Sequence, residues 1–248
     1  MASEFGWEYH LVDEGWKKWG KTVPESMDKV AQLASYAAGK QVGIWVWVRW
    51  SDVNNPANDW ESMRSFFSSL AKTGIKGIKI DFMDSASRER LAFYDAVAEN
   101  LAKNKLMVNF HGANTPTGEE RSWPHEMSRE GIYGGEQNIW AAIGGRHYCA
   151  LPFTRLVSGH ADFTGGYFGH GPKLRGSSWP LQMAANIIYT SPVLHWVSNP
   201  ADMEAAFPKG SPEREAVRNI PSVWDETIVL PPSAIGECAA FALSLIHI

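Results

Sequence analysis

The sequence has few of the features that mark membrane proteins, disulfide-stabilised proteins or metal knots. Only two of its 248 residues are cysteines, Cys149 and Cys238. They lie far apart in a chain too long to need covalent stabilisation, so we expect buried thiols rather than a disulfide framework. No apolar run approaches the roughly 18 residues that a membrane span requires, and the N-terminus lacks the basic and apolar segments of a signal peptide. We therefore expect no membrane partner.

The sequence also lacks a basic stripe. Its formal net charge is -4 and charges of both signs are interspersed, so we expect no nucleic-acid partner. Hydrophobic residues make up 44% of the chain, enough for the core of one barrel-sized domain. Twelve residues are tryptophan, several times ordinary usage. Such a surplus is typical of the stacking faces of sugar sites, although tryptophans also serve as large core residues.

Strand-like and helical patterns alternate along the first half of the chain. Apolar, β-branched runs predict strands, and apolar stripes at helical spacing predict helices. Pro24 suits the first turn of one helix and Asn58 the cap of the next. The expected strands occupy 6–13, 41–50, 74–81 and 105–112, and the expected helices occupy 24–40, 58–74 and 87–104.

Polar or aromatic residues stand at the carboxyl end of every expected strand. Asp13, Trp47, Asp81 and His111 recur at steps of 34, 34 and 30 residues, about the length of one strand–helix unit. A barrel and an open doubly wound sheet both fit this order. The strand-end residues favour a barrel, whose active sites are built there, and no glycine-rich phosphate loop follows the first strand.

The second half of the chain is less regular. We expect a short strand in 131–136 that ends at Glu136, another in 151–159, and a glycine-rich loop over 159–178. A helix followed by a short strand is expected in 179–196, and two strands joined by a turn after Asp225. The last six residues, 243–248, resemble a translated sequencing adapter, and we expect them to be an artefact.

Two acidic residues at strand ends are the minimum apparatus for hydrolysing a glycosidic bond. Asp81 follows an apolar strand directly, and Glu136 follows two glycines. One acid must be ionised and the other protonated. The alternative is that Asp81 caps a turn and Glu136 is solvated, and Asp84 is expected to cap the following helix. A metal hydrolase built on His160, His170 and His195 is disfavoured because their spacing matches no compact ligand motif.

Five segments of the sequence resemble glycoside hydrolase family 97. They are "VDEGW" (12–16), "IKIDFMD" (78–84), "NFHGANTPTGEERSWPHEMSREGIYGGE" (109–136), "LPFTRLVSGHADFT" (151–164) and "IPSVWDETIVL" (220–230). The resemblance implies an α/β fold with a (β/α)8 TIM barrel as the catalytic domain. It also implies a calcium-dependent enzyme, either an inverting α-glucosidase or a retaining α-galactosidase.

The resemblance also implies roles for individual residues. Inverting members carry a Glu after the strand-end His, where this chain has Gly112, whereas Asp81 matches the nucleophile of retaining members. Glu136 matches the acid/base and, together with Glu130, a calcium ligand. The expected substrate-binding residues are Lys79, His111, Trp47 and Asp13.

The chain departs from the family pattern at its ends. It lacks the family's N-terminal β-sandwich and the first barrel strand, so we expect seven of eight strands. The expected domains are an incomplete barrel over 1–222, the start of a C-terminal β-domain over 223–242, and the artefact over 243–248. A missing strand exposes two sheet edges, so we expect the isolated fragment to be poorly soluble or inactive while its intact parent is a glycosidase.

The function expected from the sequence is a retaining exo-acting hydrolase that releases terminal α-galactose from an oligosaccharide or α-galactoside. An α-glucosidase of the same family and an inactive sugar-binding fragment remain open as alternatives. Compartment also remains open. Family members are often exported, which points to a periplasmic or secreted parent.

Overall fold

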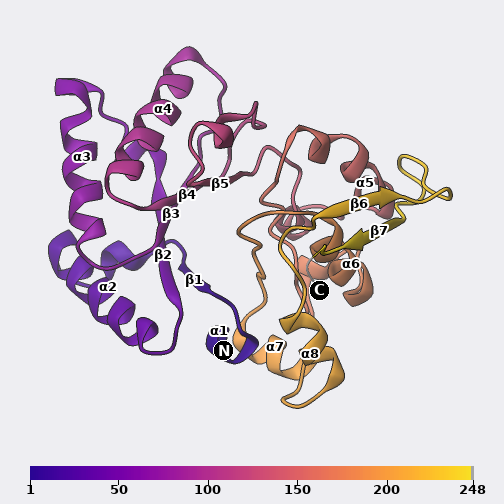
Figure 1. The fold of residues 1–248 in the computed structure, drawn as a ribbon. Helices are drawn as coiled ribbons and strands as arrows, with labels where there is room; N and C mark the ends of the chain where they lie inside the picture. The colour runs from indigo at the N-terminus through magenta and orange to yellow at the C-terminus, as the bar shows by residue number, and fades with distance from the viewer. Residues whose placement is uncertain (247–248) are drawn as a thin grey trace. The chain divides into compact units, whose positions relative to one another are not determined.

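The structure, a computed structural model, describes residues 1–246 and divides into two compact units (Figure 1). The first unit holds Met1–Asn114 and Glu119–Met127, and the second holds Thr115–Gly118 and the chain from Ser128. The helices of the first unit, with η denoting a 3-10 helix, are α1 (Ala2–Phe5), η1 (Trp16–Lys18), α2 (Val23–Ala38), η2 (Trp50–Asp52), α3 (Ala57–Ala71), α4 (Arg88–Lys103) and η3 (Glu119–Arg121).

A five-stranded sheet forms the centre of the first unit. Its strands follow the order of the chain, and the first four pair in parallel. They are β1 (Tyr9–Val12), β2 (Gly43–Arg49), β3 (Gly77–Asp81), β4 (Met107–Phe110) and β5 (Glu126–Arg129), whose last two residues belong to the second unit. The four strands expected in this half of the chain are confirmed.

The two faces of this sheet differ in chemistry. On one face, α2, α3 and α4 pack against the strands (Figure 1), and the core joins Val30, Phe67 and Val97 of these helices to Ile78 and Val108. Because successive strand residues point to opposite faces, the polar and aromatic residues share the other face. They include Trp45, Trp47, Lys79, Asp81 and Asn109.

A glycine in β3 makes room for a tryptophan on that second face. Gly77 is paired with Trp45 of β2, and a Cβ at Gly77 would lie 2.4 Å from the indole. The backbone of Gly77 is extended, so space rather than conformation requires glycine here.

The predicted helix starts are only partly correct. Thr22 caps α2 by accepting a hydrogen bond from the Glu25 amide at 3.3 Å, and Pro24 lies in the first turn as expected. Asn58 does not cap α3, because Pro56 precedes the helix and Asn58 has a φ of 50°. Asp84 does not cap α4, because the Ser87 hydroxyl accepts from the Arg90 amide instead.

The second unit is mostly helical and packs around a separate core. That core contains Ile143, Tyr148, Leu151, Phe163, Ala185 and Tyr189. The elements are η4 (Gly135–Ile139), α5 (Gly145–Ala150), η5 (Leu151–Phe153), η6 (Arg155–Ser158), η7 (Pro172–Leu174), α6 (Trp179–Ile188), α7 (Pro200–Ala206), α8 (Pro212–Arg218), β6 (Glu226–Val229) and β7 (Phe241–Ser244).

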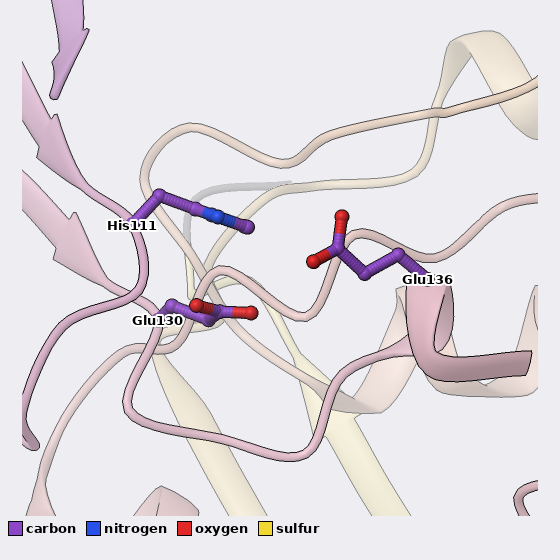
Figure 2. A group of neighbouring side chains, drawn as sticks. All are labelled: His111, Glu130 and Glu136. Atoms are coloured by element: carbon purple, nitrogen blue, oxygen red, sulfur yellow. The ribbon is translucent and has the colours of Figure 1, made fainter. Parts of the chain in front are cut away.

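Three strand predictions in this unit are wrong. Residues 131–136 form no strand, and Glu136 lies on η4 (Figure 2). Residues 151–159 form η5 and η6, and the part of 179–196 after α6 is irregular. The described chain therefore has five strands in its main sheet rather than the seven expected. The wrong predictions rest on short apolar runs, whose periodicity does not separate strand from turn.

The C-terminal strand prediction is confirmed, since β6 and β7 pair antiparallel. Leu243 and Ser244, expected to start the artefact, pair with Thr227 and Glu226, and residues 247–248 of that expected segment lie outside the described residues. Domain boundaries at 222 and 242 stay predictions.

The two cysteines are free, as expected, but Cys149 and Cys238 are half-buried rather than buried. Among the described residues, no helix combines the length and the hydropathy of a membrane span.

Candidate active-site residues

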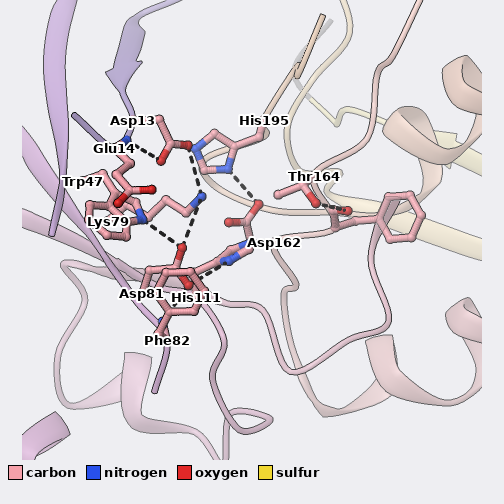
Figure 3. Close-up of polar contacts among 11 residues, drawn as sticks. Asp13, Glu14, Trp47, Lys79, Asp81, Phe82, His111, Asp162, Thr164 and His195 are labelled. Carbon is pink, nitrogen blue, oxygen red and sulfur yellow. Dashed lines mark hydrogen bonds and ion pairs between the residues drawn. The ribbon is translucent and has the colours of Figure 1, made fainter. Parts of the chain in front are cut away.

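Asp81 ends β3 and is surrounded by side chains from the neighbouring strands (Figure 3). The Trp47 indole donates to Asp81 Oδ2 at 2.8 Å, and His111 Nδ1 lies 3.3 Å from Oδ1. The Phe82 amide also donates to Oδ1, at 2.6 Å. The Asp81 side chain is thus fixed in orientation by groups from three consecutive strand ends.

These contacts keep Asp81 ionised. Burial raises the pKa of this carboxyl, but the hydrogen bond and charge of His111, the charge of Lys79 and the hydrogen bond from Trp47 outweigh it. The net effect lowers the pKa of Asp81 from 3.8 to about 2. A carboxylate with this environment is a nucleophile or a cation ligand rather than a proton donor at neutral pH.

Lys79 connects two of the acidic residues on the open face of the sheet. Its ammonium lies 4.0 Å from Asp81 Oδ2 and 3.5 Å from Asp13 Oδ2. Lys79 is buried, whereas the Asp13 side chain is 59% exposed. The structure therefore brings together the four residues that the sequence placed at the strand ends of this half of the chain, Asp13, Trp47, Asp81 and His111. Lys79, which precedes Asp81 by two residues, lies among them.

The loop that follows β3 has a left-handed backbone. Phe82 has a φ of 63° and Asp84 a φ of 45°, a conformation that costs a non-glycine residue about 1–2 kcal/mol. The Asp84 amide donates to the Gly112 carbonyl at 2.6 Å, which ties this loop to the end of β4. Strained backbone of this kind concentrates at functional sites.

The backbone around Gly112 is crowded. Its φ is 55°, and a Cβ there would lie 3.0 Å from the Phe82 amide nitrogen and from Asp84 Oδ1. A side chain at 112 would meet both backbone strain and crowding. The local structure thus favours glycine at position 112.

In the second unit, Glu130 and Glu136 approach each other (Figure 2). Glu130 directly follows β5 and Glu136 lies in the first turn of η4, and carboxylate oxygens of the two residues lie within 4.8 Å. The pair predicted to bind a metal is thus close enough to share a cation. Carboxylate oxygens are the ligands that Ca²⁺ prefers.

Two glycines place Glu136. The Gly135 amide donates to the Phe163 carbonyl at 2.7 Å. A Cβ at Gly134 would lie 2.7 Å from that same carbonyl oxygen, and one at Gly135 would lie 2.8 Å from the Thr164 carbonyl oxygen. The two glycines therefore allow a close approach of the backbone at Phe163 and Thr164.

A buried arginine, which the sequence analysis missed, holds the loop that carries Glu130. The Arg155 guanidinium donates to five carbonyl oxygens at 2.9 to 3.1 Å, those of Arg129, Glu130, Gly131, Gly159 and His160. Burial lowers the pKa of Arg155 to about 10, so it remains charged at neutral pH. A guanidinium that donates to several carbonyl oxygens fixes the backbone where no strand pairing does so.

The sequence analysis also missed a contact between Asp162 and His195. His195 Nδ1 lies 2.7 Å from Asp162 Oδ1, and Asp162 is almost completely buried (Figure 3). The sequence considered His195 only as a metal ligand beside His160 and His170. The three have separate partners, because His160 Nδ1 lies 3.1 Å from the Thr190 hydroxyl and His170 packs on Trp179. The separation of 33 residues between Asp162 and His195 gave no sequence signal.

Comparisons with known proteins agree with the resemblance found in the sequence. A family model described as glycoside hydrolase 97 matches residues 1–132. A probable retaining α-galactosidase of Streptomyces bingchenggensis is 34% identical over 247 residues, which cover 97% of this chain and 37% of the relative. A retaining α-galactosidase of Bacteroides thetaiotaomicron is 32% identical over 250 residues, covering 93% and 36%. The chain spans little more than a third of the length of these relatives.

Solved structures share the fold at lower identity. A β-arabinopyranosidase crystal structure is 22% identical with a TM-score of 0.76, over 98% of this chain and 40% of that one. A glycoside hydrolase family 97 enzyme from Pseudoalteromonas sp. strain K8, in complex with acarbose, is 23% identical with a TM-score of 0.80, over 98% and 42%. The α/β arrangement with a parallel sheet is therefore similar to that of these structures.

Proposed function

Because the chain belongs to the glycoside hydrolase 97 family, we propose that it carries the catalytic residues of a retaining exo-acting hydrolase that releases terminal α-galactose. Two curated relatives named as retaining α-galactosidases, each more than 30% identical, support this substrate and stereochemistry. The observation on which the proposal depends most is the environment of Asp81. Three donors and a nearby ammonium keep this carboxylate ionised at the end of β3.

We further propose that the sheet belongs to a (β/α)8 barrel. Four parallel strands with α2, α3 and α4 on one face support a barrel wall with its helices outside. The antiparallel pair β6–β7 would then begin the C-terminal β-domain. Catalytic residues of barrel enzymes stand at the carboxyl ends of the strands, which is where Asp81 and His111 lie.

In the proposed first step, an Asp81 carboxylate oxygen attacks the anomeric carbon while the bond from that carbon to the leaving oxygen breaks. The Glu136 carboxyl gives its proton to that oxygen. Trp47 and the Phe82 amide hold Asp81 in orientation, and Lys79 and His111 stabilise its charge before the attack. The product is a covalent glycosyl ester of Asp81.

In the second step, water gives a proton to Glu136 and attacks the anomeric carbon, and Asp81 leaves as a carboxylate. The same contacts that lower the pKa of Asp81 make it a good leaving group here. Two displacements at one carbon restore the original configuration, so the first product is α-galactose. Lys79, His111 and Asp13 are proposed to contact sugar hydroxyls around the same carbon, and Trp47 is proposed to stack against the sugar.

We propose calcium as the cofactor, with Glu130 and Glu136 among its ligands. Their carboxylate oxygens lie within 4.8 Å of each other and are of the type Ca²⁺ prefers. Ca²⁺ takes six to eight oxygens, so further ligands are required. When bound, the ion would supply positive charge beside Glu136, which favours the carboxylate that Glu136 forms as its proton moves to the leaving oxygen.

The test compares the turnover of paired aryl glycosides. The substrates are 4-nitrophenyl α-D-galactoside, α-D-glucoside and β-L-arabinopyranoside, the last of which has the ring configuration of α-galactose without its C6 group. We expect the galactoside to be preferred and proton NMR to detect α-galactose first. Asp81→Asn should lower kcat by about 1000-fold or more. Azide should restore turnover in Asp81→Gly by forming a glycosyl azide.

Asp84→Asn is the matched control, since Asp84 is an exposed carboxylate three residues further along the chain. The assay is run on the chain alone and on a chimeric protein in which this chain replaces the matching segment of the Streptomyces relative. Preference for the glucoside would support an α-glucosidase instead. Sugar binding without turnover in both versions would support a sugar-binding fragment, and equal kcat for Asp81→Asn and Asp84→Asn would refute Asp81 as the nucleophile.

A further inference from the structure

In the Asp162–His195 pair, Asp162 holds only one of the two ring nitrogens of His195. Asp162 is 1% exposed and lies 2.7 Å from His195 Nδ1, so this nitrogen carries the proton and donates to the carboxylate. The other ring nitrogen, Nε2, has no hydrogen-bond partner in the part of the chain that the structure describes. The His195 side chain remains 15% exposed. The partner left for Nε2 is therefore solvent or a ligand.

Asp162 adjoins the strand end that carries Glu130. Ala161 forms a parallel bridge with Arg129, and the Asp162 amide donates to the Arg129 carbonyl at 3.3 Å. The segment around Asp162 thus runs beside the end of β5. In parallel neighbours, residues that follow the paired positions lie at the same edge. Asp162 and Glu130 directly follow the paired residues Ala161 and Arg129, so they lie at the same edge.

Asp162 adjoins the turn that carries Glu136 as well. The next residue, Phe163, accepts a hydrogen bond through its carbonyl from the Gly135 amide at 2.7 Å. Gly135 immediately precedes Glu136. Backbone hydrogen bonds therefore link the chain on either side of Asp162 to the segments that carry Glu130 and Glu136. Both glutamates are proposed to bind calcium, and Glu136 is also proposed to transfer the proton.

The segment that carries His195 is anchored in the same way. The Val197 amide donates to the Gly165 carbonyl at 3.1 Å, and the Ser198 hydroxyl accepts from the Phe168 amide at 2.6 Å. The Trp196 ring stacks on Phe168 with centroids 5.9 Å apart. A histidine with its backbone and one ring nitrogen fixed presents the other nitrogen in a defined direction. This is the preorganisation that a binding group requires.

We propose that His195 is a substrate-binding residue whose Nε2 accepts a hydrogen bond from a hydroxyl of the sugar handled by Glu136, and that Asp162 is its positioning residue. The proposal rests on the proposed glycosidase function. Neutral imidazole with Nδ1–H held by a carboxylate is the form that accepts through Nε2. A sugar hydroxyl beside Glu136 is a donor of matching chemistry.

The experiment combines substitutions at His195 with sugars that lack one hydroxyl. His195→Phe removes both ring nitrogens, whereas His195→Gln keeps a polar group close to the position of Nε2. His160→Phe is the matched control, because His160 lies in the same unit and bonds Thr190 instead. Turnover is measured on the chain alone and on the chimeric protein with the Streptomyces relative, using 4-nitrophenyl α-galactoside and its four deoxy forms, at positions 2, 3, 4 and 6. Binding of methyl α-galactoside is measured by saturation-transfer NMR.

We expect His195→Phe to lower kcat/KM by about 10- to 100-fold, mainly through KM, and His195→Gln to recover part of the loss. One deoxy sugar should lose a similar factor with the unsubstituted chain and lose nothing more with His195→Phe. A purely structural role would lower turnover of all five substrates by the same factor. Asp162→Asn, which keeps an acceptor for Nδ1, should give a smaller loss than His195→Phe.

The outcomes distinguish the proposed role of His195 from the proposed glycosidase function. Turnover by the unsubstituted chain with additive losses in His195→Phe and every deoxy sugar would overturn the role of His195 and leave the glycosidase function intact. Sugar binding without turnover that is lost in His195→Phe and kept in His160→Phe would support the role of His195 and overturn the hydrolase function. Neither turnover nor binding would overturn both.

Discussion

The low pKa of Asp81 predicts how the stability of the chain depends on pH. A pKa lowered from 3.8 to about 2 corresponds to a contribution of about 2.5 kcal/mol to the free energy of unfolding. Because the folded pKa lies below the unfolded one, this contribution is complete above the unfolded pKa and is lost as pH falls through about 2. Between pH 6 and pH 3, about 1 kcal/mol of it should disappear.

Asp81→Asn removes this dependence because the amide does not titrate. Urea unfolding of both chains at pH 6, 5, 4 and 3 gives the difference in free energy of unfolding at each pH. We expect the advantage of the unsubstituted chain to shrink by about 1 kcal/mol across this range. In Asp81→Asn, the side-chain NH2 group faces the donors of Trp47 and His111, which lowers the free energy of unfolding at every pH. Only the change of the difference with pH therefore reports the pKa of Asp81.

Asp95→Asn is the control for the loss of an acidic residue, since Asp95 is exposed on α4. If the difference between the unsubstituted chain and Asp81→Asn stayed constant from pH 6 to pH 3, Asp81 would have an ordinary pKa in the folded chain. The side chains at the neighbouring strand ends would then not be what keeps Asp81 ionised.

Three further predictions concern other positions. Gly112→Ala should lower the free energy of unfolding by about 1–3 kcal/mol, more than Gly74→Ala, because both have positive φ but only Gly112 is crowded. Arg155→Met should cost about 3 kcal/mol or more, because five carbonyls lose their donor. Added Ca²⁺ should raise the Tm, corresponding to about 2.7 kcal/mol at 100 times its Kd, and Glu130→Gln should weaken this effect.

Each of these has a contrary result. Equal losses in Gly112→Ala and Gly74→Ala by urea unfolding would show that crowding at 112 contributes nothing. Arg175 is exposed and donates to one carbonyl, that of Trp140, so an equal loss in Arg175→Met would show that the contacts of Arg155 add no stability. A Tm unchanged by Ca²⁺ or by chelation, or an unchanged Ca²⁺ effect in Glu130→Gln, would argue against the metal site.

Most of the first unit follows from sequence patterns. Apolar runs separated by helices predicted β1 to β4, and the order of strands in the sheet repeats the order of the chain. The residues at the strand ends meet because parallel strands of similar length end at the same edge. The grouping of Trp47, Asp81 and His111 is thus a consequence of local periodicity repeated about every 30 residues.

The second unit was predicted less well, because its backbone is held by side chains and close approaches rather than by a regular ladder. Glu136 was expected on a strand and lies on η4, where two glycines bring the turn against Phe163 and Thr164. Residues 151–159 were expected as a strand and form two 3-10 helices around Arg155. Propensity and periodicity describe neither kind of contact.

The sequence by itself determined the helix–strand alternation, the polar and aromatic residues at the strand ends, the C-terminal strand pair and the family resemblance. These depend on spacings of two, four or about 30 residues, which are visible along the chain. Only the tertiary structure decided that Lys79, Trp47 and His111 lower the pKa of Asp81, that Arg155 gathers five carbonyls, and that His195 holds Asp162. These depend on contacts between residues far apart in the sequence, where no period relates one partner to the other.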